Sequence, residues 1–592
     1  MFSLNDECFN ERKCLCGNRR VFKDGQSTSC RFATRMMKSR GYSLQVLILI
    51  MVFSLTLGNT HETRGHCLPE QVHLAFGNSV TEVVIVWATR GVCSDTNIRY
   101  GTLSWALNDI AVGRTIKFTE GNSGGLQNLH RVELKNLHTA TTYFYEPQSN
   151  NVSSGPFYFQ TPAAITDWSP LFLILGDLDA DSSSIPPLTS EVMSGQYSAV
   201  IHVGDVVYNE TGDEGKTEDL FMKLTEVMAS HAPYMVTPGR YGKGSSFEQY
   251  RHRYSMPGSS WPIPKDKVWY SVDVGPVHLI SYSTEVFFTS DQTNVRSQRD
   301  WLMADLKQAN DKRDQQPWVV AIGHRPMYCS NNSRTNSDCA KDDSKVRQGF
   351  EDLFFDYGVD VVLQSHDVYE RMWPLYKGVV LSKNYTNPTA PIQLVVGAAD
   401  VHSDDGHDDN VNQSNDTESE QPWSAFNPNI SVSSHGHLHV INSSHAYWEV
   451  KSTHGGDLLD SVWIVQKKHG PFKTESLPKN VSNEIKESLK KTGGKPSYLD
   501  NSPTAPKKSA IFGNDRTRHI AIGIASGTFV LVIIATVVAI RKCRKPRQGA
   551  RRWEQLDFNY GKKLYAPSKD MDKELDNDFE IDMNDGTTKL LS

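Results

Sequence analysis

The sequence has little net charge and few long apolar runs. Its 592 residues carry a formal net charge of −6, so it lacks the positive excess typical of a protein that binds nucleic acid, and we expect no nucleic-acid partner. Only two stretches are long and apolar enough to indicate targeting or membrane insertion, and the remainder has the composition of a folded globular protein. The length exceeds what one hydrophobic core normally supports, which predicts two or three domains with additional tails.

The first apolar run is too short to cross a bilayer. It covers residues 44–57, and its length of about 14 residues is typical of a signal-peptide core. Two basic residues and the pair Met36-Met37 stand just before it. We therefore interpret residues 36–60 as a signal peptide. Residues 1–35 are Cys-rich and basic and fit no targeting pattern, so we interpret them as an artefact of gene prediction or an unstructured extension.

The second apolar run has the features of a membrane anchor. Residues 520–540 contain no charged side chain and are long enough to span a bilayer as a helix. Five of the seven residues at positions 541–547, directly after this run, are basic. A buried core helix would not require such a flank, whereas a membrane-spanning helix is oriented with its basic flank in the cytoplasm. The pattern predicts a single-pass type I protein of the plasma membrane, with a polar stalk at 467–518 and a cytoplasmic tail at 541–592.

Glycosylation sequons and cysteines agree with this topology. Every N-x-S/T sequon lies in the proposed extracellular part, where glycosylation occurs. These sequons are Asn151, Asn209, Asn331, Asn384, Asn412, Asn415, Asn429, Asn442 and Asn480. The same part holds an even number of cysteines in an oxidising compartment, which suggests two disulfides, most simply Cys67–Cys93 and Cys329–Cys339.

Two segments of different character make up the extracellular part. Residues 68–161 contain runs rich in β-branched and aromatic residues with turn signals between them, which predicts an all-β sandwich of the fibronectin type III kind. In residues 168–466, apolar strands end in small turns that carry polar side chains, and helix-like stretches lie between some of them. This alternation predicts an α/β domain of mixed sheets flanked by helices, whose functional groups gather where strands end.

The polar residues at these strand ends form one chemical set. They are Asp177, Asp205, Tyr208, His324 and His366. Carboxylate, phenolate and imidazole ligands suit a hard trivalent metal beside a softer divalent one. A lone histidine at a strand end is more often structural than a metal ligand, but five potential ligands at successive strand ends favour a two-metal site. Such a site suits reactions of phosphate esters, because the two metal ions neutralise the charge of the phosphoryl group and lower the pKa of the attacking water.

Longer segments in the same order resemble the purple acid phosphatases, in particular the animal, plant-like branch with an N-terminal fibronectin-like domain. The resemblance extends over residues 68–466 and implies a metallophosphoesterase fold. It is carried by segments that include GDVVY (204–208), YRHRYSMPG (250–258), GHRPMYCS (323–330) and NPTAPIQLVVGAA (387–399).

The resemblance implies roles for four residues. Asp177 matches a ligand of the ferric ion, Asp205 matches the carboxylate that bridges both metals, and Tyr208 matches the tyrosine whose charge transfer to iron gives the purple colour. His324 matches a ligand of the divalent metal. The family uses iron together with zinc, manganese or a second iron, hydrolyses phosphate monoesters, and often forms homodimers.

One motif of the family is changed here. The pattern GNH[DE] reads Gly239-Arg240-Tyr241-Gly242. Arg240 replaces an asparagine ligand, and a guanidinium has no lone pair to donate to a metal. Tyr241 replaces a histidine that assists with the proton or the phosphate, and the ordinary tyrosine pKa near 10 makes Tyr241 a poor base at acid pH.

A second motif is shortened. The pattern GHxH-x-YER reads Ser365-His366-Asp367-Val368-Tyr369 onward, with one residue missing. An alignment anchored on the preceding strand, which we prefer, keeps His366 as a divalent-metal ligand and loses the second histidine. An alignment anchored on YER places Ser365 and Asp367 at the two histidine positions. In either case Asp367 is a candidate ligand.

Two functions follow from these changes. One is a phosphatase acting on phosphate monoesters with altered activity. The other is a pseudophosphatase, a glycosylated surface protein that binds a partner or an anion such as inorganic phosphate, held by the permanent charge of Arg240 without turnover.

If translation begins at Met36 or Met37, the protein purified from cells should contain no peptide from residues 1–35, because those residues would never be synthesised. Mass-spectrometric peptide mapping of the full chain checks this, with peptides from residues 68–161 as the internal control. Detection of a peptide from residues 1–35 would contradict the interpretation.

Overall fold

The computed structural model describes residues 66–487 with internal gaps, the longest of which are 207–215, 240–246, 331–337 and 400–420. The predicted signal peptide at 36–60, the apolar run at 520–540 and the predicted tail at 541–592 lie outside the described residues. In the part of the chain that is described, no helix is both long and apolar enough to cross a membrane.

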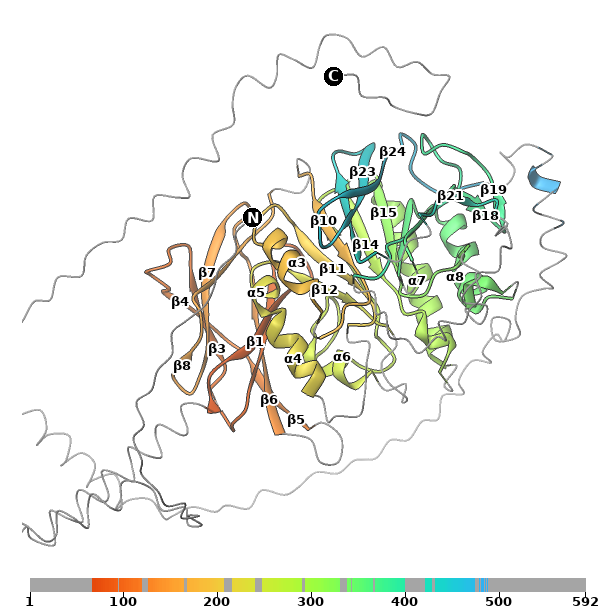
Figure 1. Cartoon of the computed structure of the whole chain (residues 1–592). Coiled ribbons are helices and arrows are strands. Elements are labelled where there is room, and N and C mark those ends of the chain that lie inside the picture. Colours follow the sequence, from red (N-terminus) through yellow and green to blue (C-terminus); the bar gives the residue numbers. More distant parts are fainter. Residues whose placement is uncertain are drawn as a thin grey trace, which may run out of the picture. The chain divides into compact units, whose positions relative to one another are not determined.

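The N-terminal segment is an antiparallel β-sandwich, as the sequence predicted (Figure 1). Its first sheet has the order β1-β2-β6-β5, with strands Glu70–Phe76, Val83–Thr89, Leu126–Leu134 and Arg114–Thr119. Its second sheet has the order β4-β3-β7-β8, with β9 also paired to β7. These strands are Asp109–Val112, Asn97–Gly101, Thr142–Ser149, Val152–Ser153 and Phe157–Gln160. Side chains of both sheets, such as Ile85, Trp87, Ile98 and Tyr145, share one buried core.

The α/β domain contains two larger mixed sheets, again as predicted. One has the order β12-β11-β10-β22-β23-β24, with strands Tyr234–Thr237, Ala199–Val203, Leu171–Leu175, Ser434–Val440, His445–Ser452 and Leu458–Val465. The other has the order β13-β14-β15-β16-β20-β17-β21, with strands Tyr270–Val274, Val277–Ser281, Trp318–Ile322, Val361–Gln364, Ile392–Val395, Glu370–Met372 and Ser424–Phe426. A short hairpin joins β18 (Leu375–Tyr376) to β19 (Val379–Val380).

One hydrophobic core unites both large sheets. It includes Leu173 and Leu438 of the first sheet and Val320 and Val362 of the second. The central strands β10, β11, β15 and β16 are almost continuously buried, which is why they read as apolar runs without polar alternation.

Helices lie outside this pair of sheets. Figure 1 shows α3, α4 and α5 on one side of the strands and α7 and α8 on the other. The helices are α3 (Ile185–Val192), α4 (Lys216–Leu224), α5 (Glu226–Ala229), α6 (Glu248–Arg253), α7 (Thr293–Asp311) and α8 (Lys345–Asp356). Helix α8 begins where the Ser344 hydroxyl accepts a hydrogen bond from the backbone N–H of Arg347, a standard N-cap contact.

Both predicted disulfides are confirmed. Cys67 is bonded to Cys93, just before β1 and just after β2. Cys329 is bonded to Cys339 across the segment that follows β15. The second bond joins cysteines that are 10 positions apart in the sequence.

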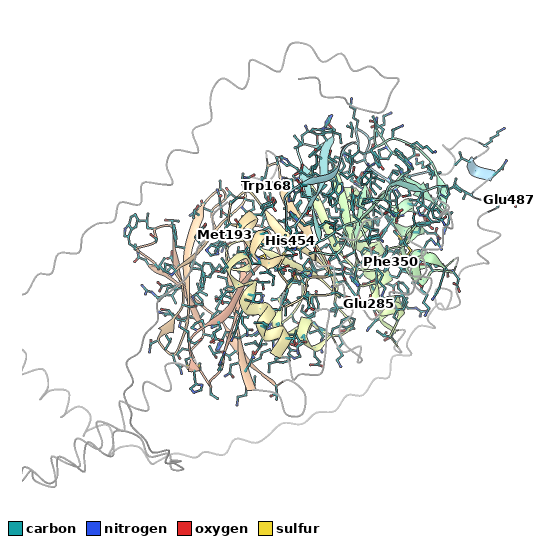
Figure 2. All side chains as sticks on the ribbon, viewed as in Figure 1. Trp168, Met193, Glu285, Phe350, His454 and Glu487 are labelled. Atoms are coloured by element: carbon teal, nitrogen blue, oxygen red, sulfur yellow. A yellow bond between two sulfur atoms is a disulfide. The ribbon has the colours of Figure 1, made fainter. Side chains whose placement is uncertain are left out.

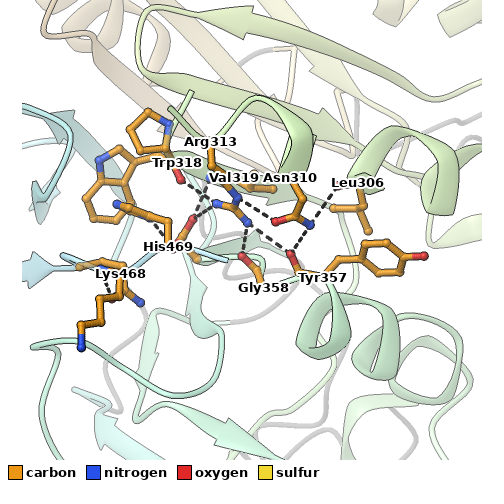
Figure 3. Close-up of polar contacts among 12 residues, drawn as sticks. Leu306, Asn310, Arg313, Trp318, Val319, Tyr357, Gly358, Lys468 and His469 are labelled. Carbon is orange, nitrogen blue, oxygen red and sulfur yellow. Dashed lines mark hydrogen bonds and ion pairs between the residues drawn. The ribbon is translucent and has the colours of Figure 1, made fainter. Parts of the chain in front are cut away.

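A buried ion pair fixes the end of α7 to the second sheet (Figure 3). Arg313 donates to Asp360 at 2.7 Å and to the carbonyls of Pro317 and Gly358 at 2.6 and 2.5 Å. Asp360 also accepts from the backbone N–H of Val319 at 2.9 Å and contacts His469 Nδ1 at 2.9 Å. Because Asp360 precedes β16 and Val319 lies in β15, this ion pair sets how two central strands lie against the helix.

Replacing Asp360 with alanine should lower the free energy of unfolding by about 3–5 kcal/mol, because it leaves the charge of Arg313 buried without its partner. Arg90→Ala is the matched control, since the Arg90 side chain is 62% exposed in its contact with Glu70 and should cost less than about 1 kcal/mol. Denaturant unfolding of the full chain measures both. Equal effects of the two substitutions would contradict the assigned role of Asp360.

Candidate metal centre

Four strand ends meet at one edge of the two central sheets. Asp177 follows β10, Asp205 follows β11, His324 follows β15, and Ser365 follows β16. Strands β10 and β11 are parallel, and so are β15 and β16, so within each pair the carboxyl ends point the same way. Residues far apart in the sequence therefore reach one place, the usual position of functional groups in an open α/β sheet.

Three of these side chains form a compact and buried cluster. Ligand atoms of Asp177, Asp205 and His324 all lie within 4.8 Å of one another. The Nε2 atom of His324 is 3.3 Å from Asp205 Oδ1, while its Nδ1 lies 3.1 Å from the carbonyl oxygen of Val203. The backbone contact orients the ring so that Nε2 faces the carboxylates. Two carboxylates and one imidazole at this spacing fit a metal ion such as iron or zinc.

The backbone is strained at both aspartates. Asp177 has φ of 49° and Asp205 has φ of 45°, which is the left-handed region that non-glycine residues seldom adopt. Such conformations cost about 1–3 kcal/mol each and persist where the surrounding structure enforces them, often at functional sites. The strain turns both carboxylates from the strand direction toward the cluster.

Two glycines leave the space that the cluster needs. A Cβ atom at Gly204 would lie 2.6 Å from Cγ and Nδ1 of the His324 ring, and Gly204 itself has φ of 78°. A Cβ atom at Gly239 would lie 2.0 Å from the backbone nitrogen of Asp205. Both positions therefore require glycine for steric reasons.

Polar contacts hold the cluster from outside. The Ser365 hydroxyl donates to Asp177 Oδ2 at 2.5 Å. Arg325, next to His324, forms a paired contact with Glu285 at 2.7 and 2.9 Å, and Figure 2 labels Glu285. The planar guanidinium fixes the loop after β15 in two directions at once, which positions His324.

The electrostatics of the cluster favour a bound cation. Burial lowers the pKa of His324, but the carboxylates of Asp205, Asp177 and Glu285 together raise it to about 9. Without a metal the ring therefore carries a proton that balances the two aspartates. A metal ion must displace that proton, so its binding weakens as the pH falls.

The structure thus brings together three of the predicted site residues, namely Asp177, Asp205 and His324. The others lie outside the described residues, and these are Tyr208, Arg240, Tyr241, His366 and Asp367. Sequence reasoning gave Ser365 only as an alternative at a histidine position. Its contact with Asp177 depends on two strands that are remote in the sequence, and its place directly after a buried strand was the one available signal.

Family models match three consecutive segments of the chain. Residues 69–161 match the N-terminal domain of purple acid phosphatase. Residues 170–370 match the calcineurin-like phosphoesterase family. Residues 390–461 match the C-terminal region described as iron/zinc purple acid phosphatase-like.

Individual proteins match over most of the described part. The chain is 35% identical over 444 residues to human acid phosphatase type 7, covering 71% of this chain and 96% of that protein. It is 28% identical to purple acid phosphatase 22 of Arabidopsis thaliana, covering 68% of this chain and 87% of that protein. The solved structure of purple acid phosphatase PPD1 from yellow lupin shares the fold with a TM-score of 0.55 at 19% identity, covering 68% of this chain and 75% of that one.

Gly204→Ala should weaken metal binding about 10–100-fold, the usual cost of disturbing a ligand's support, because the added methyl group would displace His324. Gly195→Ala is the matched control: Gly195 has φ of 77°, close to that of Gly204, but nothing lies within 4 Å of its Cβ position. Metal content after dialysis against graded chelator measures both variants. Equal metal retention would contradict the steric argument.

Proposed function

The chain belongs to the purple acid phosphatase family, and we propose that it is a membrane-anchored, extracellular enzyme that hydrolyses phosphate monoesters. The observation that carries the proposal is the convergence of Asp177, Asp205 and His324 within 4.8 Å. Its relatives in human and Arabidopsis thaliana are acid phosphatases, which supports the same reaction.

The three buried donors fit a cation, and the resemblance distributes them over the two metal positions of the family. Asp177 would hold the ferric ion, His324 the divalent zinc, manganese or iron, and Asp205 both. When bound, such a pair supplies positive charge to the phosphoryl group and lowers the pKa of a nearby water. Ser365 contributes by fixing one carboxylate oxygen of Asp177, and His202, Thr237 and other buried neighbours exclude bulk water from the strand ends.

The altered GNH[DE] motif affects proton transfer, through Tyr241, and phosphate binding, through Arg240. At acid pH a tyrosine with its ordinary pKa is protonated, so Tyr241 can donate a hydrogen bond but cannot accept a proton. Arg240 offers several N–H donors in a fixed plane, which suits two oxygens of one phosphate group. In the family, an asparagine at this position binds the divalent metal ion. We infer that in this chain Arg240 binds the phosphoryl group directly, in place of that metal ion.

A second candidate function rests on the same two residues. With Arg240 and Tyr241 in place of a metal ligand and an acid–base group, the chain would bind inorganic phosphate or a phosphorylated partner and not turn it over. The pseudophosphatase differs from the enzyme in a measurable way, because it binds phosphate without releasing product.

We expect the full chain to contain about two metal ions, to show a visible charge-transfer band from Tyr208, and to hydrolyse a phosphomonoester at acid pH. Asp205→Asn should abolish all three. The double substitution Arg240→Asn with Tyr241→His rebuilds the family motif and should raise the rate, by up to about 10²–10⁴-fold if a positioned acid–base group is restored.

The outcomes separate the two functions. A colourless parent chain without turnover, which gains turnover in the rebuilt double variant, would identify a pseudophosphatase. Phosphate binding that survives Arg240→Ala would contradict the role given to Arg240 in either function.

The proposed topology accounts for the exposed sequons. Asn151, Asn384 and Asn442 are exposed in the structure and accessible to glycosylation. Deleting residues 520–592 should release the protein into the medium, because it removes the membrane anchor. Deleting residues 548–592 alone should leave it on the cell surface, because the apolar run and its basic flank at 541–547 remain. Immunoblotting of medium and membrane fractions, with and without N-glycan removal, measures this. A chain retained in cells after the longer deletion, or unchanged in mass by deglycosylation, would contradict the topology.

A further inference from the structure

A second cluster of metal-ligating side chains lies between helix α3 and strand β22. Glu191 comes from the last turn of α3, and His435 and His437 come from β22. Ligand atoms of the three residues lie within 4.8 Å of one another. Both histidines are almost fully buried, with 2% and 3% of their surface exposed. Met193, which follows α3 and is labelled in Figure 2, marks the helix end beside which the cluster lies.

The strand register explains why the two histidines face the same helix. Residues two apart in a strand point to the same side of the sheet. His437 is opposite Glu449 in the neighbouring strand β23, and His435 is opposite Lys451. The sequence signal is therefore the His-x-His spacing within β22. This spacing alone does not indicate a metal site, because the third ligand, Glu191, comes from a helix that is remote in the sequence.

Both rings present Nε2 to the same carboxylate. His435 Nε2 lies 2.8 Å from Glu191 Oε2, and His437 Nε2 lies 3.0 Å from Glu191 Oε1. His435 Nε2 is buried and lacks hydrogen-bond geometry toward any partner despite this short contact.

The opposite ring nitrogens are held by other side chains. His437 Nδ1 is 2.9 Å from Glu449 Oε1, and His435 Nδ1 is 3.1 Å from the hydroxyl of Thr453. A histidine that donates Nδ1–H to a carboxylate keeps the lone pair on Nε2 for a metal, and this carboxylate–histidine pairing is typical of zinc ligands. Lys451 Nζ, at 2.8 Å from Glu449 Oε1, balances the charge of that carboxylate.

The spacing is close to what a tetrahedral ion requires. Ligands bound to zinc at about 2.0–2.1 Å are about 3.3 Å apart. The two measured contacts to Glu191, at 2.8 and 3.0 Å, need to widen by only a few tenths of an ångström. Glu191 is partly exposed, at 26% of its side chain, so solvent reaches the cluster and can supply the fourth ligand. The phenol of Tyr197 donates to Glu191 Oε1 at 2.6 Å and lies 3.2 Å from His437 Nε2.

This cluster is separate from the candidate metal centre at the strand ends. His437 is paired with Leu173 of β10 and Gly436 with Ile174, which places His435 beside Leu175, two residues before Asp177. At about 3.3 Å of rise per residue, the two histidines lie roughly 7 and 13 Å from Asp177 along the strand. The two clusters share no ligand.

We propose that Glu191, His435 and His437 bind one Zn²⁺ ion with a water as the fourth ligand, and that this ion ties α3 to β22. Helix α3 follows directly on the loop that begins at Asp177, so the ion would also limit the movement of that loop. The inference is independent of whether the strand-end centre is catalytically active.

The test uses the full chain with Asp177→Asn and His324→Gln, which removes the strand-end centre from the zinc count. After dialysis against zinc and then buffer, this background chain should retain about one zinc per molecule. Adding Glu191→Gln or His437→Gln should weaken zinc retention at least tenfold. The matched control is His439→Gln, because His439 lies on the same strand two residues further on, contacts Ser169 instead, and belongs to neither cluster. It should leave zinc retention unchanged.

Thermal unfolding provides the second readout. Zinc should raise the unfolding temperature of the background chain and of the His439→Gln variant but not that of the Glu191→Gln variant, since only a ligand that binds the folded state stabilises it. Magnesium should have no such effect, because it prefers oxygen ligands in octahedral geometry. Should His437→Gln fail to fold, Glu191→Gln at the partly exposed helix end answers the same question. Should the background chain fail to fold, the parent chain and its Glu191→Gln variant are compared for the loss of one zinc.

Two results would overturn the proposal. One is a folded background chain that retains no zinc, which would mean that the three residues form only an ion-paired link between helix and strand. The other is equal zinc retention with and without Glu191→Gln.

Discussion

Two buried carboxyl groups that lie beside each other need a compensating proton or cation, and much of the structure depends on that constraint at Asp177 and Asp205. Burial removes the water that would otherwise screen the repulsion between them. His324 supplies the charge as a protonated ring when no metal is bound, which is why its pKa is raised to about 9 despite burial. A metal ion supplies it otherwise. A proton on His324 and a bound metal ion therefore compete to balance the same two carboxylates.

The surrounding backbone is adapted to this arrangement. The left-handed conformations of Asp177 and Asp205 are unfavourable in themselves and are maintained by parallel strands that are buried on both faces. Gly204 removes the side chain that would collide with His324. The rigid part of the centre therefore comes from strand ends that are packed in one core with the rest of the α/β domain.

The departures from the family pattern are not among the three clustered ligands. Arg240, Tyr241 and Asp367 lie outside the described residues, in segments that follow β12 and β16 in the sequence. A chain can retain a metal-binding frame held by sheet packing while other residues of its sequence change, because a fold does not by itself fix the function it carries.

The sequence by itself determined the layered α/β class, the β-sandwich that precedes it, both disulfides, and Asp177, Asp205 and His324 as members of one site. Buried strands with polar residues at their ends are local patterns, and a local pattern can be read without knowing which strands are neighbours. Helices α4 and α5 are divided at Thr225, whose hydroxyl donates to the backbone carbonyl of Phe221. Only the tertiary structure decided the contact of Ser365 with Asp177, the fit of Gly204 against His324, and the meeting of Glu191 with His435 and His437. Each of these contacts joins elements that are remote in the sequence. The order and register of the strands and the position of the helix decide which side chains meet, and these depend on the packing of the whole hydrophobic core.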